Sequence, residues 1–181
     1  MKNKLSTQML TLMGLLIALI IVLSNILAID TQFLKLTFAF IPKMIMGMIF
    51  GPFWTAVGSV VADLIGNTMF AKAPFFFGFT LNKILEGLIY GYFFYNKKIT
   101  WKNCILCTVT VTALINLGLT PLWLSMLYNT PLNSWIIWAP RLVKTAAMLP
   151  IQTIVMYGVA KVLPMERLTR NIVGFRRTES W

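Results

Sequence analysis

Long apolar runs divide most of this sequence into segments of membrane-spanning length. Hydrophobic residues make up 58% of the 181 residues and charged residues only 12%, about half the charged share of a soluble domain. An apolar span of about 20 residues crosses the hydrocarbon core of a bilayer, so the length allows about five to seven helices. The sequence therefore predicts an all-α integral membrane protein, with residues 1–181 forming one bundle.

Six transmembrane helices are expected in this bundle. Gly51 and Pro52 interrupt a continuous apolar stretch and are expected to separate two short helices. Lys2 and Lys4 precede the first apolar run, and no clear small-residue cleavage site follows it, so we expect this run to be retained as a helix. The expected helices are Gln8 to Ile29, Ile41 to Phe50, Phe53 to Asn67, a fourth that follows the loop Met69 to Gly78 and ends near Tyr95, Cys104 to Tyr128, and Trp135 to Leu163.

Positive charge gathers at the two termini and in the loop that holds Lys97, Lys98 and Lys102. Six helices put both termini on one side together with this loop, and the positive-inside rule places that side in the cytoplasm. The chain is thus predicted to be a multi-pass protein of a bacterial-type cell membrane. Nucleic acid is not the expected partner of the +11 net charge, because the basic residues flank apolar spans, where they meet anionic lipid headgroups.

Arg141 and Lys144 interrupt the last apolar segment. They lie three residues apart, so on a helix both project from one face, and a guanidinium at that depth is costly without a partner. The chain has 16 Lys and Arg against 5 Asp and Glu, so most cations cannot pair with acids. We expect this face to meet an anionic ligand or a water-filled cavity. The alternative is that both side chains reach the interface and contact lipid phosphate.

Aromatic residues mix with polar ones in the segments predicted to lie on the outer side. The loop from Asp30 to Thr37 has this mixture, and so do the opening turns of the fourth helix. Aromatic faces with an amide and a carboxylate can hold a flat heterocycle and recognise its edge; a solvated loop and a simple ion pair between Lys83 and Glu86 are the alternatives. The candidate binding residues in these segments are Gln32, Phe33, Lys35, Phe79, Asn82, Lys83 and Glu86.

Other polar residues lie inside apolar helices. Asn116, near the middle of the fifth helix, must hydrogen-bond another helix or a ligand, and Pro121 is expected to kink that helix. Asp63 also needs a partner, and we expect Lys43 on the preceding helix to provide a structural ion pair. The remaining candidate binding residues are Asn116, Trp123, Trp138, Arg141 and Lys144.

Catalytic chemistry finds little support in the sequence. The chain has no histidine, no clustered acids for a metal and no setting that would activate Ser or Cys, which disfavours a membrane enzyme acting on lipid. Cys104 and Cys107 form a C-x-x-C pair at the start of an apolar helix, and without a second pair they are expected to be two small buried residues. No phosphate-binding G-x-x-x-x-G-K-[ST] loop is present, so the chain is not expected to hydrolyse ATP. We expect neither a cofactor nor a metal.

Several short motifs follow one another in an informative order. They are Ile41-Pro42, Phe50-Gly51-Pro52, Asp63-Leu64-Ile65-Gly66, Phe77-Gly78-Phe79-Thr80, Gly87-Leu88-Ile89-Tyr90-Gly91 and Arg141-Leu142-Val143-Lys144. This order resembles the S components of energy-coupling factor (ECF) vitamin transporters, over nearly the whole chain. Among these the chain is most similar to the folate-specific S components, for which the motif at Arg141 is the main reason.

The resemblance implies a six-helix substrate-binding subunit that takes up a vitamin with high affinity from outside the cell. It implies as partners a transmembrane coupling protein and two ATPase subunits, which supply the energy. In this family a small-xxx-small motif on the first helix contacts the coupling protein; Gly14 and Ala18 match it, with Gly in place of the more usual Ala.

Folate suits the candidate residues in two respects. Its glutamate tail carries two carboxylates, which Arg141, Lys144 and Lys35 or Lys83 can bind. Its pterin is flat, with donors and acceptors along its edge, and suits stacking on aromatic rings beside an amide or Glu86. Pantothenate, thiamine and riboflavin are the alternative ligands, although a neutral or cationic vitamin would leave Arg141 and Lys144 without a counter-charge.

Overall fold

A computed structural model describes residues 7–30, 35–70, 76–97, 99–129, 131 and 135–162. Its elements, in chain order, are α1 (Thr7–Ile21), the π-helix η1 (Val22–Ile26), β1 (Ile29–Asp30), β2 (Lys35–Leu36), α2 (Phe40–Phe70), α3 (Phe77–Phe94), α4 (Trp101–Val111), the π-helix η2 (Thr112–Leu119), α5 (Thr120–Tyr128) and α6 (Trp135–Val162). The two strands, which were not expected, form a short antiparallel pair. All other regular secondary structure in the described ranges is helical, as predicted.

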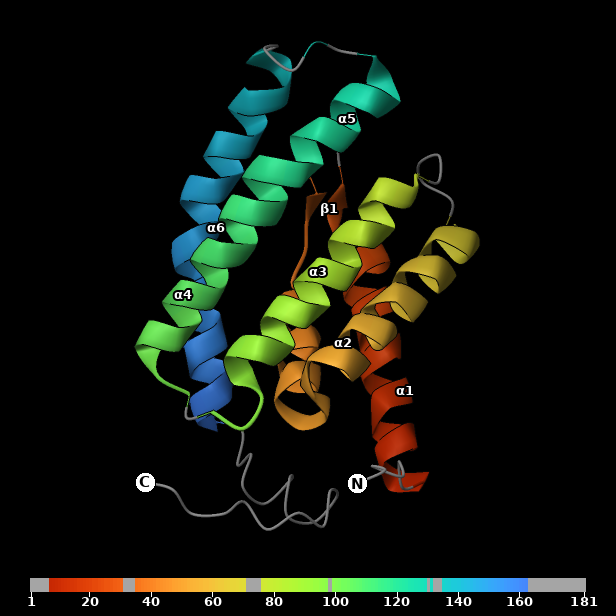
Figure 1. Cartoon of the computed structure of the whole chain (residues 1–181), viewed down its shortest axis with the longest axis vertical. Coiled ribbons are helices and arrows are strands. Elements are labelled where there is room, and N and C mark those ends of the chain that lie inside the picture. The colour runs from red at the N-terminus through yellow and green to blue at the C-terminus, as the bar shows by residue number, and fades with distance from the viewer. Residues whose placement is uncertain are drawn as a thin grey trace.

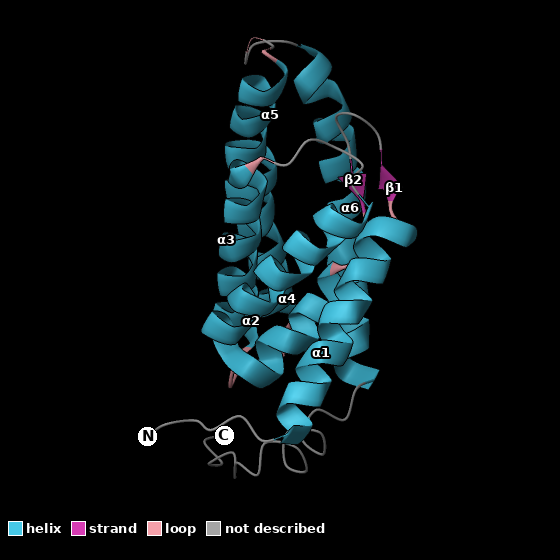
Figure 2. Ribbon diagram, turned by 90° about the vertical axis from the view of Figure 1, so that its right-hand side faces the viewer, coloured by secondary structure: helices cyan, strands magenta, loops and turns pink. Residues whose placement is uncertain are grey.

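The helices pack along one long axis into a single bundle (Figure 1). The first residues of α1 and the last residues of α6 lie at one end of the bundle. The strands β1 and β2 and the helix α5 lie toward the opposite end, which we call the hairpin end (Figures 1 and 2). Among the described residues, four helical stretches are long and apolar enough to cross a membrane: 7–26, 40–70, 101–128 and 141–162. A helical protein of membrane type is therefore confirmed.

A sharp break divides α2 into two limbs at Gly51. This residue has φ +79° and ψ −179°, in the region that an L side chain rarely adopts, and Pro52 follows it without an N–H to continue the helical bonding. The break predicted at Gly51 and Pro52 is thus confirmed. The second limb continues to Phe70, three residues beyond the expected end.

Glycines on α3 let this helix pack closely against the break. A Cβ placed on Gly91 would lie 2.2 Å from Cα of Pro52, and one on Gly87 would lie 2.6 Å from Cα of Ala56. Both neighbours are backbone atoms, which cannot rotate away as a flexible side chain can. The backbones of α2 and α3 therefore meet without intervening side chains, as in membrane proteins whose helices pack through small residues.

Replacing Gly91 with alanine is expected to destabilise the fold by about 1–3 kcal/mol, because the two helices must separate to admit the methyl group. The measurement is thermal unfolding of the purified protein in detergent. Gly158→Ala on α6 is the matched control, because a Cβ there has no neighbour within 4 Å in the described structure. An equal effect of both substitutions would contradict the close approach at Gly91.

The helix that contains Pro121 changes its winding before it reaches the proline. From Thr112 to Leu119 it is a π-helix, and Pro121 is fully buried at the start of α5. In this segment the N–H of Thr120 donates to the carbonyl of Ile115, five residues earlier. The irregularity expected at Pro121 is therefore a widened stretch in a continuous helix, which is one of the ways a helix accommodates proline.

The core lies between α1, α2, α3, α4 and α6. Tyr90, Phe94 and Met156 are each at most 1% exposed. Cys104 and Cys107 are buried there as free thiols, which confirms that they are small core residues. Many large apolar side chains on the outside of the helices are exposed in turn, for example Leu15, Phe53 and Val143, as expected for faces that contact lipid.

Candidate ligand-binding site

A cavity of about 590 Å³ lies inside the bundle, lined by residues from α1, η1, α2, α3, α4, η2, α5 and α6 and by Thr37 beside the strands. This volume lies within the range of about 300–1,000 Å³ that is typical of small-molecule sites. Among the described lining residues, four are cationic and two are carboxylates: Lys43, Lys83, Arg141 and Lys144 against Asp63 and Glu86. The cavity therefore carries an excess of positive charge and suits an anion.

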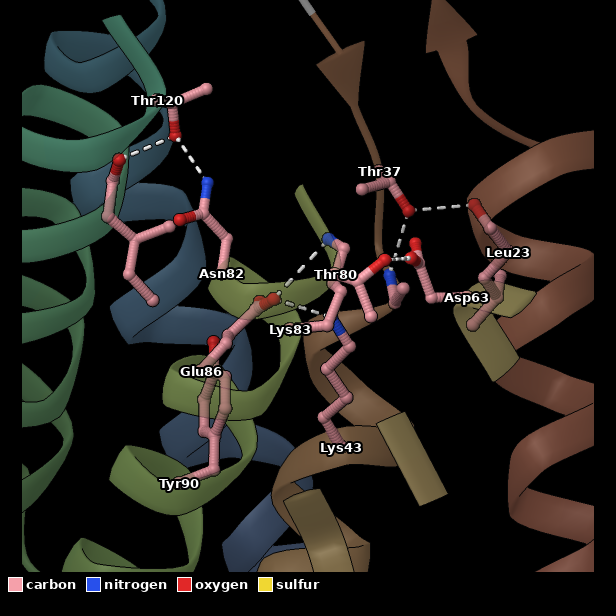
Figure 3. A network of polar contacts seen from close by, with 12 residues as sticks. Leu23, Thr37, Lys43, Asp63, Thr80, Asn82, Lys83, Glu86, Tyr90 and Thr120 are labelled. Atoms are coloured by element: carbon pink, nitrogen blue, oxygen red, sulfur yellow. Dashed lines mark hydrogen bonds and ion pairs between the residues drawn. The ribbon is translucent and has the colours of Figure 1, made fainter. Parts of the chain in front are cut away.

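Two lysines share one carboxylate in this cavity. Nζ of Lys43 lies 2.7 Å from Oε2 of Glu86, and Nζ of Lys83 lies 3.4 Å from the same oxygen. The Lys43 side chain is 4% exposed and that of Glu86 15%, so the shorter contact is an ion pair shielded from solvent. Figure 3 shows these three side chains converging from α2 and α3. Because ionic groups in an apolar bundle need partners, Glu86 is the anchor for both cations.

The predicted pairing of Lys43 with Asp63 is wrong. Asp63 instead accepts a hydrogen bond from the hydroxyl of Thr80, with 3.0 Å between the oxygens. The reason is that α3 packs against both limbs of α2 and brings Glu86 to Lys43 and Thr80 to Asp63 (Figure 3). Lys83 and Glu86 do form the i, i+3 pair that was the simpler alternative.

Asn82 connects α3 to α5 through two side-chain hydrogen bonds. Its Nδ2 donates to Oγ1 of Thr120 at 3.2 Å, and its Oδ1 accepts from Nε1 of Trp123 at 3.1 Å. The Trp123 ring also lies 5.9 Å from the ring of Phe76, centroid to centroid. Asn82 lines the cavity and is only 4% exposed. Its hydrogen bond therefore links Trp123 directly to a residue of the cavity wall.

Arg141 projects into the cavity and is 7% exposed. Its Nη1 donates to the backbone carbonyl of Asn116 at 2.9 Å, whereas its Nε has no hydrogen-bond partner in the described part of the chain. This placement does not agree with a side chain that reaches out to lipid phosphate. Lys144, one turn further along α6, is partly buried and lines the same cavity.

The backbone carbonyl of Asn116 accepts a hydrogen bond from Arg141 because it has no donor within its own π-helix. In the i to i+5 bonding of η2, the donor for this carbonyl would be the N–H of residue 121, and Pro121 has none. The carbonyl therefore needs a donor from elsewhere, and the Arg141 guanidinium provides it. The side-chain amide of Asn116 was expected to hydrogen-bond another helix or a ligand, and Asn116 does line the cavity. Its backbone carbonyl, in addition, holds Arg141, and the signal for this contact in the sequence was Pro121.

The other predicted residues are placed as follows. Phe79 lines the cavity, with its ring 5.9 Å from that of Phe76, and Trp138 is half-buried on α6 but is not among the lining residues. Lys35 belongs to β2, and its side chain is outside the description, as are residues Gln32 and Phe33 altogether. Gly14 and Ala18 are exposed on α1, and a Cβ on Gly14 would have no neighbour within 4 Å in the described structure.

Several lining residues were missed by the sequence analysis. Ser59 and Asn25 line the cavity, and so does Gln152, whose Nε2 donates to the buried hydroxyl of Tyr90 at 2.7 Å. Ser59 stands four residues before Asp63, so helical spacing places both on one face. That spacing was the available signal, but small residues on this limb also suit ordinary helix packing.

Comparison with known proteins identifies relatives over nearly the whole chain. The family described as "ECF transporter, substrate-specific component" matches residues 8–160. The folate transporter FolT of Clostridium novyi (strain NT) is 35% identical over 165 residues, which cover 91% of this chain and 95% of the relative. The folate transporter FolT of Leuconostoc mesenteroides is 31% identical over 174 residues, covering 93% of each chain.

A solved structure agrees with these relatives. It is described as the crystal structure of FolT bound with folic acid, and it superposes on this chain with a TM-score of 0.84 at 50% sequence identity. The superposition covers 88% of this chain and 95% of the solved one. The similarity thus extends over the cavity and its helices.

Proposed function

Because this chain belongs to the family of ECF transporter substrate-specific components, we propose that it binds folate with high affinity and delivers it to the rest of an ECF transporter. The observation that carries the ligand assignment, beside the names of the relatives, is Arg141. Its buried guanidinium lines the cavity, and its Nε has no hydrogen-bond partner among the described residues. The family consists of transport components, so the chain binds its substrate and does not transform it.

The charge of the cavity supports a dianionic ligand. Its described lining has two more cationic side chains than carboxylates, and Glu86 is already engaged by two lysines. Arg141 and Lys144 line the cavity from α6, where they can bind the two carboxylates of the glutamate tail of folate; a guanidinium does so with charge-assisted hydrogen bonds. Thiamine is cationic and riboflavin is neutral, so neither would compensate this excess charge. Pantothenate would supply only one carboxylate, so all three suit the cavity less well than folate does.

Tryptophan fluorescence offers a direct test of ligand identity. Trp123 donates to Asn82, which lines the cavity, so occupation of the cavity should change the emission of this residue. We expect a saturable change with folic acid and none with thiamine, riboflavin or pantothenate at equal concentration. Trp123→Phe, measured beside isothermal titration calorimetry, identifies the reporter. A calorimetric response to another vitamin but not to folic acid would refute the assignment.

The proposed membrane topology has six spans with both termini in the cytoplasm of a cell whose plasma membrane holds the protein. It is supported by the break at Gly51, which makes α2 two spans, and by the common end of the first residues of α1 and the last residues of α6 (Figure 1). Lys97 precedes α4 and Lys102 lies in its first turn, at that end of the bundle, in keeping with the positive-inside rule. The hairpin end then faces outward, and residues 1–181 act as one substrate-binding domain.

The proposed partners are a transmembrane coupling protein and two ATPase subunits, and the contact surface is the α1 face of Gly14 and Ala18. These residues are exposed and leave the helix surface flat, so that another helix can approach closely.

Gly14→Leu is expected to leave folate affinity unchanged and to reduce folate uptake by cells to background, because the side chain holds the coupling helix away. The measurements are calorimetry on the purified subunit and uptake of labelled folate by cells that produce the full transporter. Gly158→Leu on α6 is the control, because this glycine also has no neighbour within 4 Å in the described structure. Normal uptake by the Gly14 variant would exclude this face as the contact.

A further inference from the structure

A second hollow lies on the outside of the bundle. It is an open groove of about 500 Å³ between α3, α4 and the break of α2, and its lining residues are Pro52, Leu88, Ile89, Tyr92, Phe93 and Thr110. None of these six is among the described residues that line the ligand cavity. The groove is therefore a separate feature, which the binding of a vitamin inside the bundle does not explain.

The walls of this groove are largely apolar. On α3, Leu88 is 38% exposed and Tyr92 is 67% exposed, so the groove opens toward the surroundings of the bundle. On α4, the hydroxyl of Thr110 donates to the carbonyl of Leu106 at 2.7 Å, a bond that satisfies it within its own helix. The groove thus presents hydrocarbon at a face where the bundle contacts lipid, and it suits an acyl chain.

A helix of another protein fits this groove less well than a lipid chain. Transmembrane helices pack closely where small residues leave a flat strip, as Gly14 and Ala18 do on α1. The α3 wall of the groove instead carries large side chains, among them Leu88, Ile89 and Phe93. A flexible hydrocarbon chain can follow such an uneven surface, whereas a rigid helix cannot.

Two lysines stand toward one end of the groove. Nζ of Lys97 lies 4.3 Å from the centroid of the Tyr92 ring, a cation–π contact that holds the ammonium beside a groove residue. The ring has no formal charge, so this contact does not cancel that of the lysine. On α4, Lys102, Leu106 and Thr110 follow one another at four-residue spacing, which places them along one side of the helix. The groove therefore runs from apolar walls toward a cationic end.

The cationic end coincides with the end of the bundle that is proposed to face the cytoplasm. In Figure 1, α3 ends and α4 begins at the end of the bundle where α1 begins and α6 ends. Lysines at this level attract the anionic headgroups of the cytoplasmic leaflet, and basic pockets between transmembrane helices are known to bind such headgroups. Tyrosine is also typical of this interface. Charge and depth thus both favour an anionic phospholipid over a zwitterionic one.

We infer that the groove between α3 and α4 is a binding site for an anionic phospholipid, whose acyl chain lies along Leu88, Ile89 and Phe93 and whose phosphate meets Lys97 and Lys102. A lysine ammonium has three N–H donors and binds phosphate as a point charge. This inference rests on the proposed orientation in the membrane, and it does not depend on which vitamin the cavity binds.

Native mass spectrometry of the purified chain counts bound lipids directly. The protein, in a neutral detergent and without vitamin, is titrated with palmitoyl-oleoyl phosphatidylglycerol or with phosphatidylcholine that has the same acyl chains. We expect the first phosphatidylglycerol to bind about 5- to 25-fold more tightly than the first phosphatidylcholine, since each lysine near the headgroup contributes about a factor of five.

Lys97→Gln should weaken the binding of phosphatidylglycerol about 3- to 10-fold and leave that of phosphatidylcholine unchanged, because it removes one charge from the end of the groove. Lys161→Gln is the matched control. It removes another exposed cation, in the last turn of α6 at the same end of the bundle, and should change neither affinity.

Thr110→Phe tests the apolar part of the site, because the ring fills space that the acyl chain needs. We expect it to abolish the preference for phosphatidylglycerol, whereas Thr110→Ser should keep it. The melting temperature of each lipid-free variant in detergent shows whether it is folded. Should Thr110→Phe fail to fold, the exposed Lys97 still decides, because its substitution disturbs no packing in the core.

Four results would overturn the proposal. Equal affinity of wild type for the two lipids would make the groove an ordinary lipid-facing surface, and an equal effect of Lys97→Gln and Lys161→Gln would assign the preference to diffuse charge. An unchanged preference in folded Thr110→Phe would place the lipid elsewhere. Retention of neither lipid would leave the groove to a helix of another protein. None of these results bears on the folate assignment, because the cavity and the groove share no described lining residue.

Discussion

Replacing Arg141 with alanine is expected to weaken folic acid binding by about 10- to 150-fold, and to lower thermal stability only by the loss of the hydrogen bond to the Asn116 carbonyl. The guanidinium is buried in the cavity wall and donates a hydrogen bond to the Asn116 carbonyl, while its Nε has no partner within the described ranges. A charge-assisted hydrogen bond to a carboxylate contributes about 1.5–3 kcal/mol, and about 1.4 kcal/mol corresponds to a factor of ten. Calorimetric titration with folic acid measures the effect.

Two further variants control this prediction. Lys161→Ala removes an exposed cation near the end of the same helix, so it should bind folic acid as wild type does. Arg141→Lys keeps the charge but lacks the planar fork of the guanidinium, and we expect an intermediate affinity. Unchanged binding by Arg141→Ala would mean that the tail carboxylates lie elsewhere and would remove the main support for the ligand assignment.

Glu86→Ala is expected to destabilise the ligand-free protein by about 3–5 kcal/mol, because it leaves the buried Lys43 without its counter-charge. The Lys43 side chain is only 4% exposed and its ammonium lies 2.7 Å from the carboxylate, so water cannot replace the lost partner at low cost. The measurement is unfolding of the purified protein in detergent, followed by heat or by a denaturing surfactant.

The double variant with Met at both positions 43 and 86 tests the cause. If the loss in Glu86→Ala comes from the orphaned lysine, removing both charges should recover most of the stability, since an apolar pair of similar volume commonly replaces a buried ion pair without loss. A double variant as unstable as Glu86→Ala would show that the carboxylate acts through other contacts. Lys83 cannot replace Glu86 as the partner of Lys43, because both lysines carry a positive charge.

The residues of the binding site illustrate how far local patterns reach. The depth of Arg141 in an apolar run predicted a cation that needs an anion, and the mixture of polar and aromatic residues after Gly78 predicted a lined cavity. Ser59 was missed because its helical spacing from Asp63 suits ordinary helix packing as well as a cavity wall. The contact between the Asn116 carbonyl and Arg141 was not predicted, because it depends on a π-helical register that brings this carbonyl opposite Pro121.

The sequence by itself determined the membrane character, the break at Gly51 and the set of charges that an apolar bundle must accommodate, because hydropathy, φ restrictions and residue counts are local properties. Only the tertiary structure decided which charges meet. Lys43 pairs with Glu86 instead of Asp63 because α3 packs through glycine backbones against both limbs of α2. Contacts between helices depend on such close approaches, and a partner 43 residues away in the chain leaves no periodic signal in the residues between.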